Sequence, residues 1–260
     1  MKIKLAVLGL MVAGLVTGPA QAGLITHFEE TFDGEADDYL NGTTPGTTTG
    51  NAAWEGIDIF KADGSFSEGT MGSITLAFAP EAGRIYTLDG RLENTVSDSW
   101  LGFGFTDGQS DARSYDRRFL GDSAPVGRVW MLVRGDDNTG AARTFLGSGS
   151  DGETDSLDAD PSLTDLSGET DLRIVLDTRP ETWTATWYAK EAAAANYTQV
   201  RETTDILDNQ ITSVGFSISG DASGPLHHFS LTSIPEPSSW LLLLSALACG
   251  LLVRRRRGKE

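Results

Sequence analysis

The sequence is poor in residues on which metal and thiol chemistry depends. Its 260 residues contain one cysteine, Cys249, and three histidines. A single cysteine excludes an internal disulfide and a zinc site built from cysteines. Neighbouring residues of a strand point to opposite faces, so His227 and His228 are not expected to share a ligand. The phosphate loop, the dinucleotide fingerprint and the G-x-S-x-G nucleophile turn are also missing.

Basic residues are scarce and unevenly placed. Residues 23–234 contain 13 basic and 35 acidic side chains, a formal charge of −22. Residues 1–22 carry +2 and residues 235–260 carry +3. Binding to a polyanion needs clustered Lys and Arg, so nucleic acid is excluded as a partner of this acidic body.

The first 22 residues have the three parts of a secretory signal peptide. Lys2 and Lys4 supply positive charge, and an apolar stretch follows from residue 5 to residue 16. A small-x-small cleavage site, with Ala20 and Ala22 before Gly23, ends the segment. We expect the apolar stretch to form a signal helix that is too short to span a bilayer, which needs ~20 residues. We expect export through the secretion translocon and a mature chain that starts at Gly23.

The C-terminal segment, residues 234–260, has a different three-part order. Pro235-Glu236-Pro237 is followed by 14 uncharged residues, 240–253, and then by Arg254, Arg255, Arg256 and Arg257. An apolar run partitions into lipid, and a cluster of arginines resists crossing, so we expect a short transmembrane helix with stop-transfer behaviour. At ~1.5 Å per residue the run is shorter than the ~30 Å hydrocarbon core, and long basic side chains can cover part of the difference.

This C-terminal arrangement resembles the PEP-CTERM sorting signal. The proline-glutamate-proline motif, the apolar helix and the arginine cluster stand in the family's order at the end of the chain. The resemblance implies a substrate of an exosortase, a transpeptidase-like membrane enzyme of Gram-negative bacteria that make exopolysaccharide. It implies an inner-membrane anchor before processing at Pro235, Glu236 and Pro237, and an outer-surface or extracellular-matrix location afterwards.

The body, residues 23–233, is predicted to be all-β. Twelve short runs have alternating or continuous apolar character and are separated by Gly, Asp, Asn and Pro. In residues 183–188 the tryptophans fall on one face and the threonines on the other, which is typical of an antiparallel sheet with one face in the core. Residues 41–50, 106–126 and 147–168 are predicted to be long loops. Helix is nearly absent, and the expected architecture is an antiparallel two-sheet jelly-roll sandwich.

The order of these runs is similar to that of concanavalin A-like jelly rolls of the laminin G and lectin type. The runs that carry the resemblance are 26–33, 100–105, 172–178, 183–188 and a closing strand at 226–232. The resemblance implies that the closing strand lies beside the first, and that one sheet can bind glycans. It covers most of the body but includes no specific motif.

The acidic residues of the body suggest two kinds of site. Glycosidases of this fold often use E-x-D-x-x-E, and residues 153–158 match it only in part, in a glycine-rich context that predicts a loop. Calcium is the better match to the acid content, because it takes oxygen ligands from Asp and Asn in turns. The candidate ligands are Asp33, Asp37, Asp107, Asp111, Asp136 and Asp137. Solvated Asp-rich turns between strands explain the same residues without a metal.

Three functions are compatible with these features. The first is a non-enzymatic exported protein that an exosortase processes and whose sandwich associates with exopolysaccharide. The second is a glycan-cleaving enzyme on the same scaffold, which needs two carboxyl groups ~5–9.5 Å apart. The third is a structural matrix protein without a ligand. The sequence favours the first and assigns no catalytic residue.

Overall fold

The computed structural model describes residues 23–67, 72–94, 100–108, 127–134, 141–146, 157–158, 168–206, 210–219 and 224–235. These residues form fourteen strands and contain no helix. The strands are β1 (Ile25–Glu30), β2 (Thr47–Thr48), β3 (Trp54–Gly56), β4 (Gly72–Ala77), β5 (Arg84–Asn94), β6 (Trp100–Thr106), β7 (Gly127–Arg134), β8 (Ala141–Leu146), β9 (Leu157–Asp158), β10 (Gly168–Asp177), β11 (Trp183–Glu191), β12 (Thr198–Ile206), β13 (Ser213–Ser219) and β14 (Leu226–Pro235).

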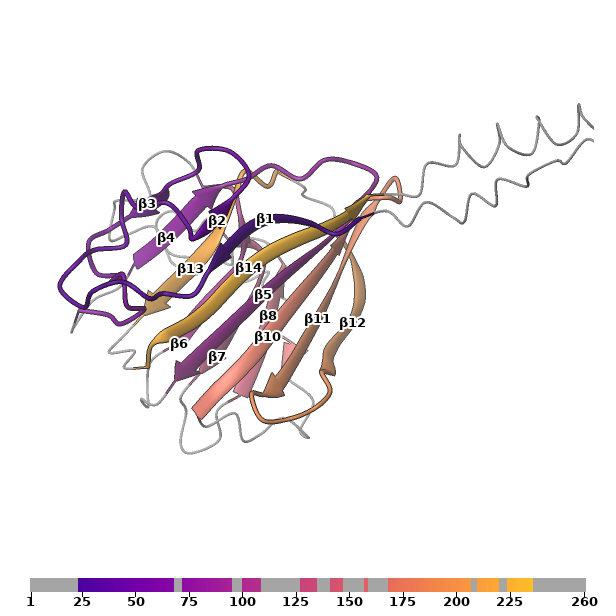
Figure 1. Ribbon diagram of the computed structural model, residues 1–260. Helices are drawn as coiled ribbons and strands as arrows, with labels where there is room; N and C mark the ends of the chain where they lie inside the picture. The colour runs from indigo at the N-terminus through magenta and orange to yellow at the C-terminus, as the bar shows by residue number, and fades with distance from the viewer. Residues whose placement is uncertain are drawn as a thin grey trace, which may run out of the picture. The chain divides into compact units, whose positions relative to one another are not determined.

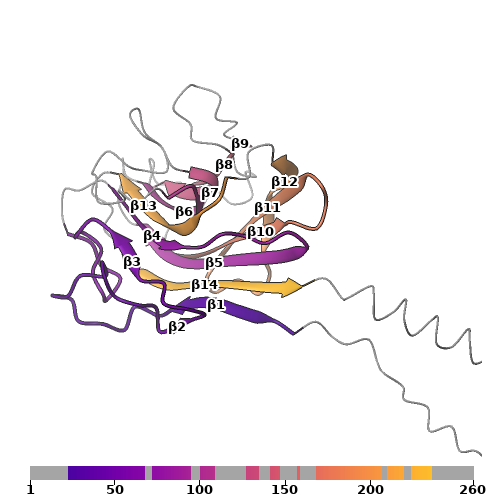
Figure 2. The same cartoon turned by 90° about the horizontal axis from the view of Figure 1, so that it is seen from above.

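The strands form two antiparallel sheets of seven strands each (Figures 1 and 2). The first sheet has the order β12-β11-β10-β5-β14-β1-β2, and the second sheet has the order β3-β4-β13-β6-β7-β8-β9. Figure 2 shows them as two layers, one above the other. The chain is therefore an all-β, two-sheet antiparallel sandwich.

One hydrophobic core fills the space between the sheets. Trp54 of β3 and Phe216 of β13 contact Phe229 of β14 in the opposite sheet, with ring centroids 5.4 and 4.9 Å apart. Trp187 of β11 reaches across the core, where its indole Nε1 donates a hydrogen bond of 3.2 Å to the carbonyl of Trp130. Offset aromatic pairs add to the free energy of apolar burial, so these contacts hold the two layers together.

The strand predictions are confirmed, and the loop predictions are partly wrong. Each of the twelve expected runs overlaps a strand, and β14 pairs with β1 from Ile25↔Ser233 to Glu30↔Phe229. Trp187 is buried and Trp183 packs against the same core, as the alternation predicted. The strands β2 and β9, two residues each, lie inside segments expected to be loops. A two-residue strand has no periodicity, so no pattern could have indicated it.

The start of β1 and the end of β14 lie side by side in the first sheet. β14 extends through Pro235, two residues beyond the expected limit of the body at Ser233. Ile25 lies opposite Ser233, so Leu24 and Ile234 follow at the same edge, and both are exposed. The predicted signal helix and the predicted transmembrane helix lie outside the described residues. Among the residues that are described, no helix long and apolar enough to cross a membrane is found.

Candidate ligand-binding face

The outer face of the first sheet carries an ordered array of charges. In β5 and β10 the even-numbered residues face the core, and the odd-numbered residues face outward. Direct cross-strand pairing sets Asp89 opposite Arg173, and Arg91 opposite Asp171. In these two pairs each acidic residue faces a basic one. Opposite charges at facing positions stabilise neighbouring strands.

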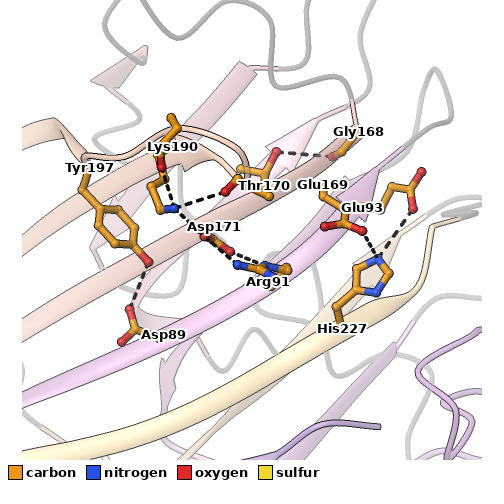
Figure 3. A network of polar contacts seen from close by, with 12 residues as sticks. Asp89, Arg91, Glu93, Gly168, Glu169, Thr170, Asp171, Lys190, Tyr197 and His227 are labelled. Carbon is orange, nitrogen blue, oxygen red and sulfur yellow. Dashed lines mark hydrogen bonds and ion pairs between the residues drawn. The ribbon is translucent and has the colours of Figure 1, made fainter. Parts of the chain in front are cut away.

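Arg91, Asp171 and Lys190 form the centre of this array (Figure 3). Arg91 donates from Nε and Nη2 to the two oxygens of Asp171, at 2.6 and 3.1 Å. Lys190 Nζ lies 2.9 Å from Asp171 Oδ2. The Asp171 side chain is only 9% exposed. Burial acts to raise the pKa of Asp171, but the hydrogen bonds from Arg91 and Lys190 outweigh it, so the pKa lies below its usual value.

A second pair lies one position further along the same strands. Arg173 donates from Nε and Nη2 to Asp89, at 2.6 and 3.1 Å. Its guanidinium carbon stands 4.2 Å from the ring centroid of Tyr197, in cation–π contact. The Tyr197 hydroxyl donates to Asp89 Oδ1 at 3.4 Å. Burial, followed by the nearby Asp89 charge, raises the pKa of Tyr197, so its hydroxyl stays protonated and available as a donor.

The third position of the array is acidic. Glu93 of β5 lies directly opposite Glu169 of β10. His227 Nε2 stands 3.6 Å from a Glu93 oxygen and 3.7 Å from a Glu169 oxygen, as Figure 3 shows. His228 Nε2 is 3.9 Å from Glu29. The expectation that neighbouring histidines point to opposite faces is wrong here. A register shift between Leu226 and His228 inserts one residue into β14, and such a bulge breaks the alternation.

An open depression lies beside these charges. It has a volume of about 510 Å³ and is lined by Arg91, Glu169, Glu191, Ala192 and Ala193. The two alanines belong to the turn that follows β11, and the charged residues come from β5, β10 and β11. The lining thus combines three charged side chains with two small ones.

The outer face of the second sheet is built differently. Trp130 of β7 and Phe145 of β8 stack with ring centroids 4.0 Å apart and an interplanar angle of 10°. Both are buried, together with Leu132, and Trp100 packs against them. Gly104 lies opposite Trp130, where an added Cβ would stand 2.4 Å from the Cβ of Trp130. Glycine is needed at this position because the tryptophan is so close. Beside the rings, Ser73 donates to Ser217 at 3.1 Å, and both are buried.

The structure places only some of the predicted calcium ligands. Asp33 accepts a 2.7 Å hydrogen bond from the Thr31 hydroxyl, and Asp37 accepts one from Lys61 through its backbone carbonyl. Asp107 forms an ion pair with Arg128, which already supplies a cation to that carboxylate. Asp111, Asp136 and Asp137 lie outside the described residues. Within the described ranges, no group of three or more His, Cys, Asp and Glu side chains is arranged to hold a metal ion.

The predicted processing residues lie mainly outside the described part of the chain. Pro235 is the last residue of β14, and Gly23 is exposed before β1. Ala20, Ala22, Glu236, Pro237 and the arginines 254–257 fall outside the described residues. Their roles stay predictions from the sequence.

Sequence reasoning missed the charged array on the first sheet. Asp89, Arg91, Asp171 and Arg173 alternate with apolar residues in their strands, so the outward direction of each could have been predicted. The pairing of β5 with β10 could not, because about 80 residues separate the partners. The role of Tyr197 depends on this same pairing.

No protein-family model matches the sequence, and no curated protein matches it. Solved structures are similar in fold. The endo-1,3-beta-glucanase from Streptomyces sioyaensis is 12% identical with a TM-score of 0.48, and the match covers 82% of this chain and 98% of that one. Arcelin-5, a lectin-like defense protein from Phaseolus vulgaris, is 12% identical with a TM-score of 0.49, covering 82% and 99%.

The exoplasmic/lumenal domain of VIP36, in a form bound to Ca2+ and mannose, is 9% identical with a TM-score of 0.41, covering 71% and 83%. The three similar proteins thus include a glucanase, a lectin-like defense protein and a domain with bound sugar. Likeness of this extent assigns no ligand, metal or activity to the present chain.

Proposed function

We propose that this chain is an exported cell-surface or extracellular-matrix protein of a Gram-negative bacterium, processed by an exosortase at Pro235-Glu236-Pro237. The observation that carries the proposal is the order of that motif, the apolar run 240–253 and the arginines 254–257. The distribution of charge fits an exported body with a retained tail. The arginines oppose translocation of the tail, whereas the body has few basic residues that would oppose translocation of the body.

The chemistry of processing is a peptide-bond transfer. A bond at the motif breaks, and the acyl group of the body passes to a nucleophile of the enzyme and then to water or to an amine acceptor. The segment with the apolar run leaves with a new amino terminus. Before this step the partners are the secretion translocon and the inner membrane.

We further propose that the sandwich is concanavalin A-like and non-enzymatic, and that it associates with exopolysaccharide. The outer face of the first sheet supports this role best. Its two Arg–Asp pairs hold the partly exposed guanidinium groups of Arg91 and Arg173 in fixed positions, and sugar hydroxyls can bond to such charged groups. The depression beside Glu169 and Glu191 offers room for such a ligand.

Processing is tested by substitution of the motif in a host that has an exosortase. The wild-type chain is expected to convert to a shorter form and leave the inner-membrane fraction. The double variant Glu236→Ala/Pro237→Ala should stay full-length in that fraction, whereas the control Glu181→Ala should be processed like wild type. Equal processing of the motif variant would contradict the proposal.

Polysaccharide binding is tested with the processed protein. A ligand that binds only the folded state raises the melting temperature, so a panel of polysaccharides is compared by thermal unfolding. The variant Glu169→Gln/Glu191→Gln should lose the rise, and Glu181→Gln, at the opposite end of the sheet, should keep it. If no polysaccharide raises the melting temperature, the body is a structural matrix component.

A further inference from the structure

The processing motif begins inside the sheet. Ile234 lies opposite Ile85, and Pro235 lies opposite Arg84, in the pairing of β14 with β5. On the other side of β14, pairing with β1 stops at Ile25↔Ser233. The last two residues of β14 are therefore held by one neighbouring strand only. The first proline of the motif is the last residue of β14.

The surroundings of these two pairs are firmly held. Ser233 is buried, and its hydroxyl is 2.8 Å from His27 Nε2 of β1. The start of β5 is bonded to the end of β10: Arg84 N donates to Thr178 Oγ1 at 3.0 Å, and Thr178 N donates to the Arg84 carbonyl at 2.8 Å. If the pairs Ile234↔Ile85 and Pro235↔Arg84 separate, the end of β14 therefore moves, because Ser233 and the start of β5 stay fixed.

We propose that the last two pairs of β14 limit processing: the motif becomes accessible to the enzyme only when Ile234 and Pro235 separate from Ile85 and Arg84. This inference rests on the proposed function. An enzyme that binds an extended segment uses the backbone groups along it, and those of Ile234 are shared with β5. Cleavage of a structured segment follows the population of its open form. The body thus sets the rate at which its own anchor is removed.

The first test moves the motif away from the sheet. Insertion of Gly-Ser-Gly-Ser between Ile234 and Pro235 leaves the sheet intact up to Ile234 and frees the motif. Processing in the host is followed by pulse–chase, and the insertion should speed it about tenfold, the factor for one or two backbone hydrogen bonds. The same insertion after Gly50, where an added Cβ would meet nothing within 4 Å, is the matched control and should leave the rate unchanged.

The second test locks the same pairs. Directly opposite residues have Cα atoms about 4.5–5.5 Å apart, which suits a disulfide. The chain Ile85→Cys/Ile234→Cys, in a Cys249→Ala background, should be processed at least about tenfold more slowly when oxidised. Reduction should restore the rate, and the single variant Ile85→Cys in the same background should respond to neither condition.

The outcomes separate this inference from the function on which it rests. If neither the wild type nor the insertion variant is processed, the proposed function fails and the inference fails with it. If the wild type is processed and Glu236→Ala/Pro237→Ala is not, the function stands. Unchanged rates for the insertion and for the crosslink then overturn the inference. Slower processing of the insertion variant also overturns it, because the enzyme would then need the folded end of the sheet.

Discussion

The outer faces of the two sheets differ in burial and in chemistry. On the first sheet, β10 alternates between buried and partly exposed residues, and the outward positions carry paired charges. On the second sheet, all residues of β6 after Trp100 are buried, and the outward positions hold glycine, hydroxyl side chains and aromatic rings. The outer face of the first sheet is therefore in contact with solvent at these charges, whereas the outer face of the second sheet is buried around β6 and β7.

This difference determines which interactions stabilise each face. Ion pairs near solvent add little to the free energy of unfolding, because both charges are well hydrated when they are separate. Buried aromatic rings gain from dispersion and from the removal of apolar area from water. We therefore expect substitutions on the second sheet's outer face to cost more stability than those on the first.

The largest effect is expected at Trp130. Replacement by alanine removes the stack on Phe145 and leaves a cavity above Gly104, at a cost of about 3–5 kcal/mol in the free energy of unfolding. Val175→Ala, on the outer face of the first sheet, should cost less than ~1 kcal/mol. Denaturant unfolding of both variants measures the contrast, and equal costs would show that the two faces are energetically alike.

A smaller effect is expected within the charged array. Arg91→Met keeps the aliphatic stem but leaves the Asp171 carboxylate, 9% exposed, with Lys190 alone, so we expect a loss of ~1–3 kcal/mol. Arg179→Met breaks an exposed pair with Asp177 and should cost under ~1 kcal/mol. A double-mutant cycle of Arg91→Met with Asp171→Asn checks that the loss belongs to this pair, and additive losses would refute it.

The smallest effect is a dependence of stability on pH. The folded state holds the pKa of Asp171 below the usual 3.8, so this carboxylate contributes its full stability above pH ~4 and loses it as the pH falls through the lowered value. The difference in unfolding free energy between wild type and Asp171→Asn should be largest near neutral pH and shrink on acidification below pH ~4. A difference that stays constant with pH would mean that Asp171 acts through packing.

The fold could be predicted further than the site. Alternation in residues 183–188 indicated the face on which Trp183 and Trp187 pack against the core, and the neighbourhood of β1 and β14 followed from a resemblance in strand order. The charged array depends on which strands pair. The pairing of strands about 80 residues apart cannot be predicted from the local sequence pattern. The bulge at His227 could not be predicted either. One inserted residue changes the face to which neighbouring side chains point, without changing the composition of the strand.

The position of the chain ends has a mechanical consequence. The first and last strands of the body are antiparallel neighbours, and their free ends lie side by side at Ile25 and Ser233. Tension between the two ends would load the pairs of β1 and β14 one at a time and peel them apart at low force. Under the proposed function, an anchored body would be pulled from the C-terminus alone. A ligand held at Glu169 and Glu191, near the far end of the same sheet, would then load β14 and β5 along their length, so that many pairs resist together.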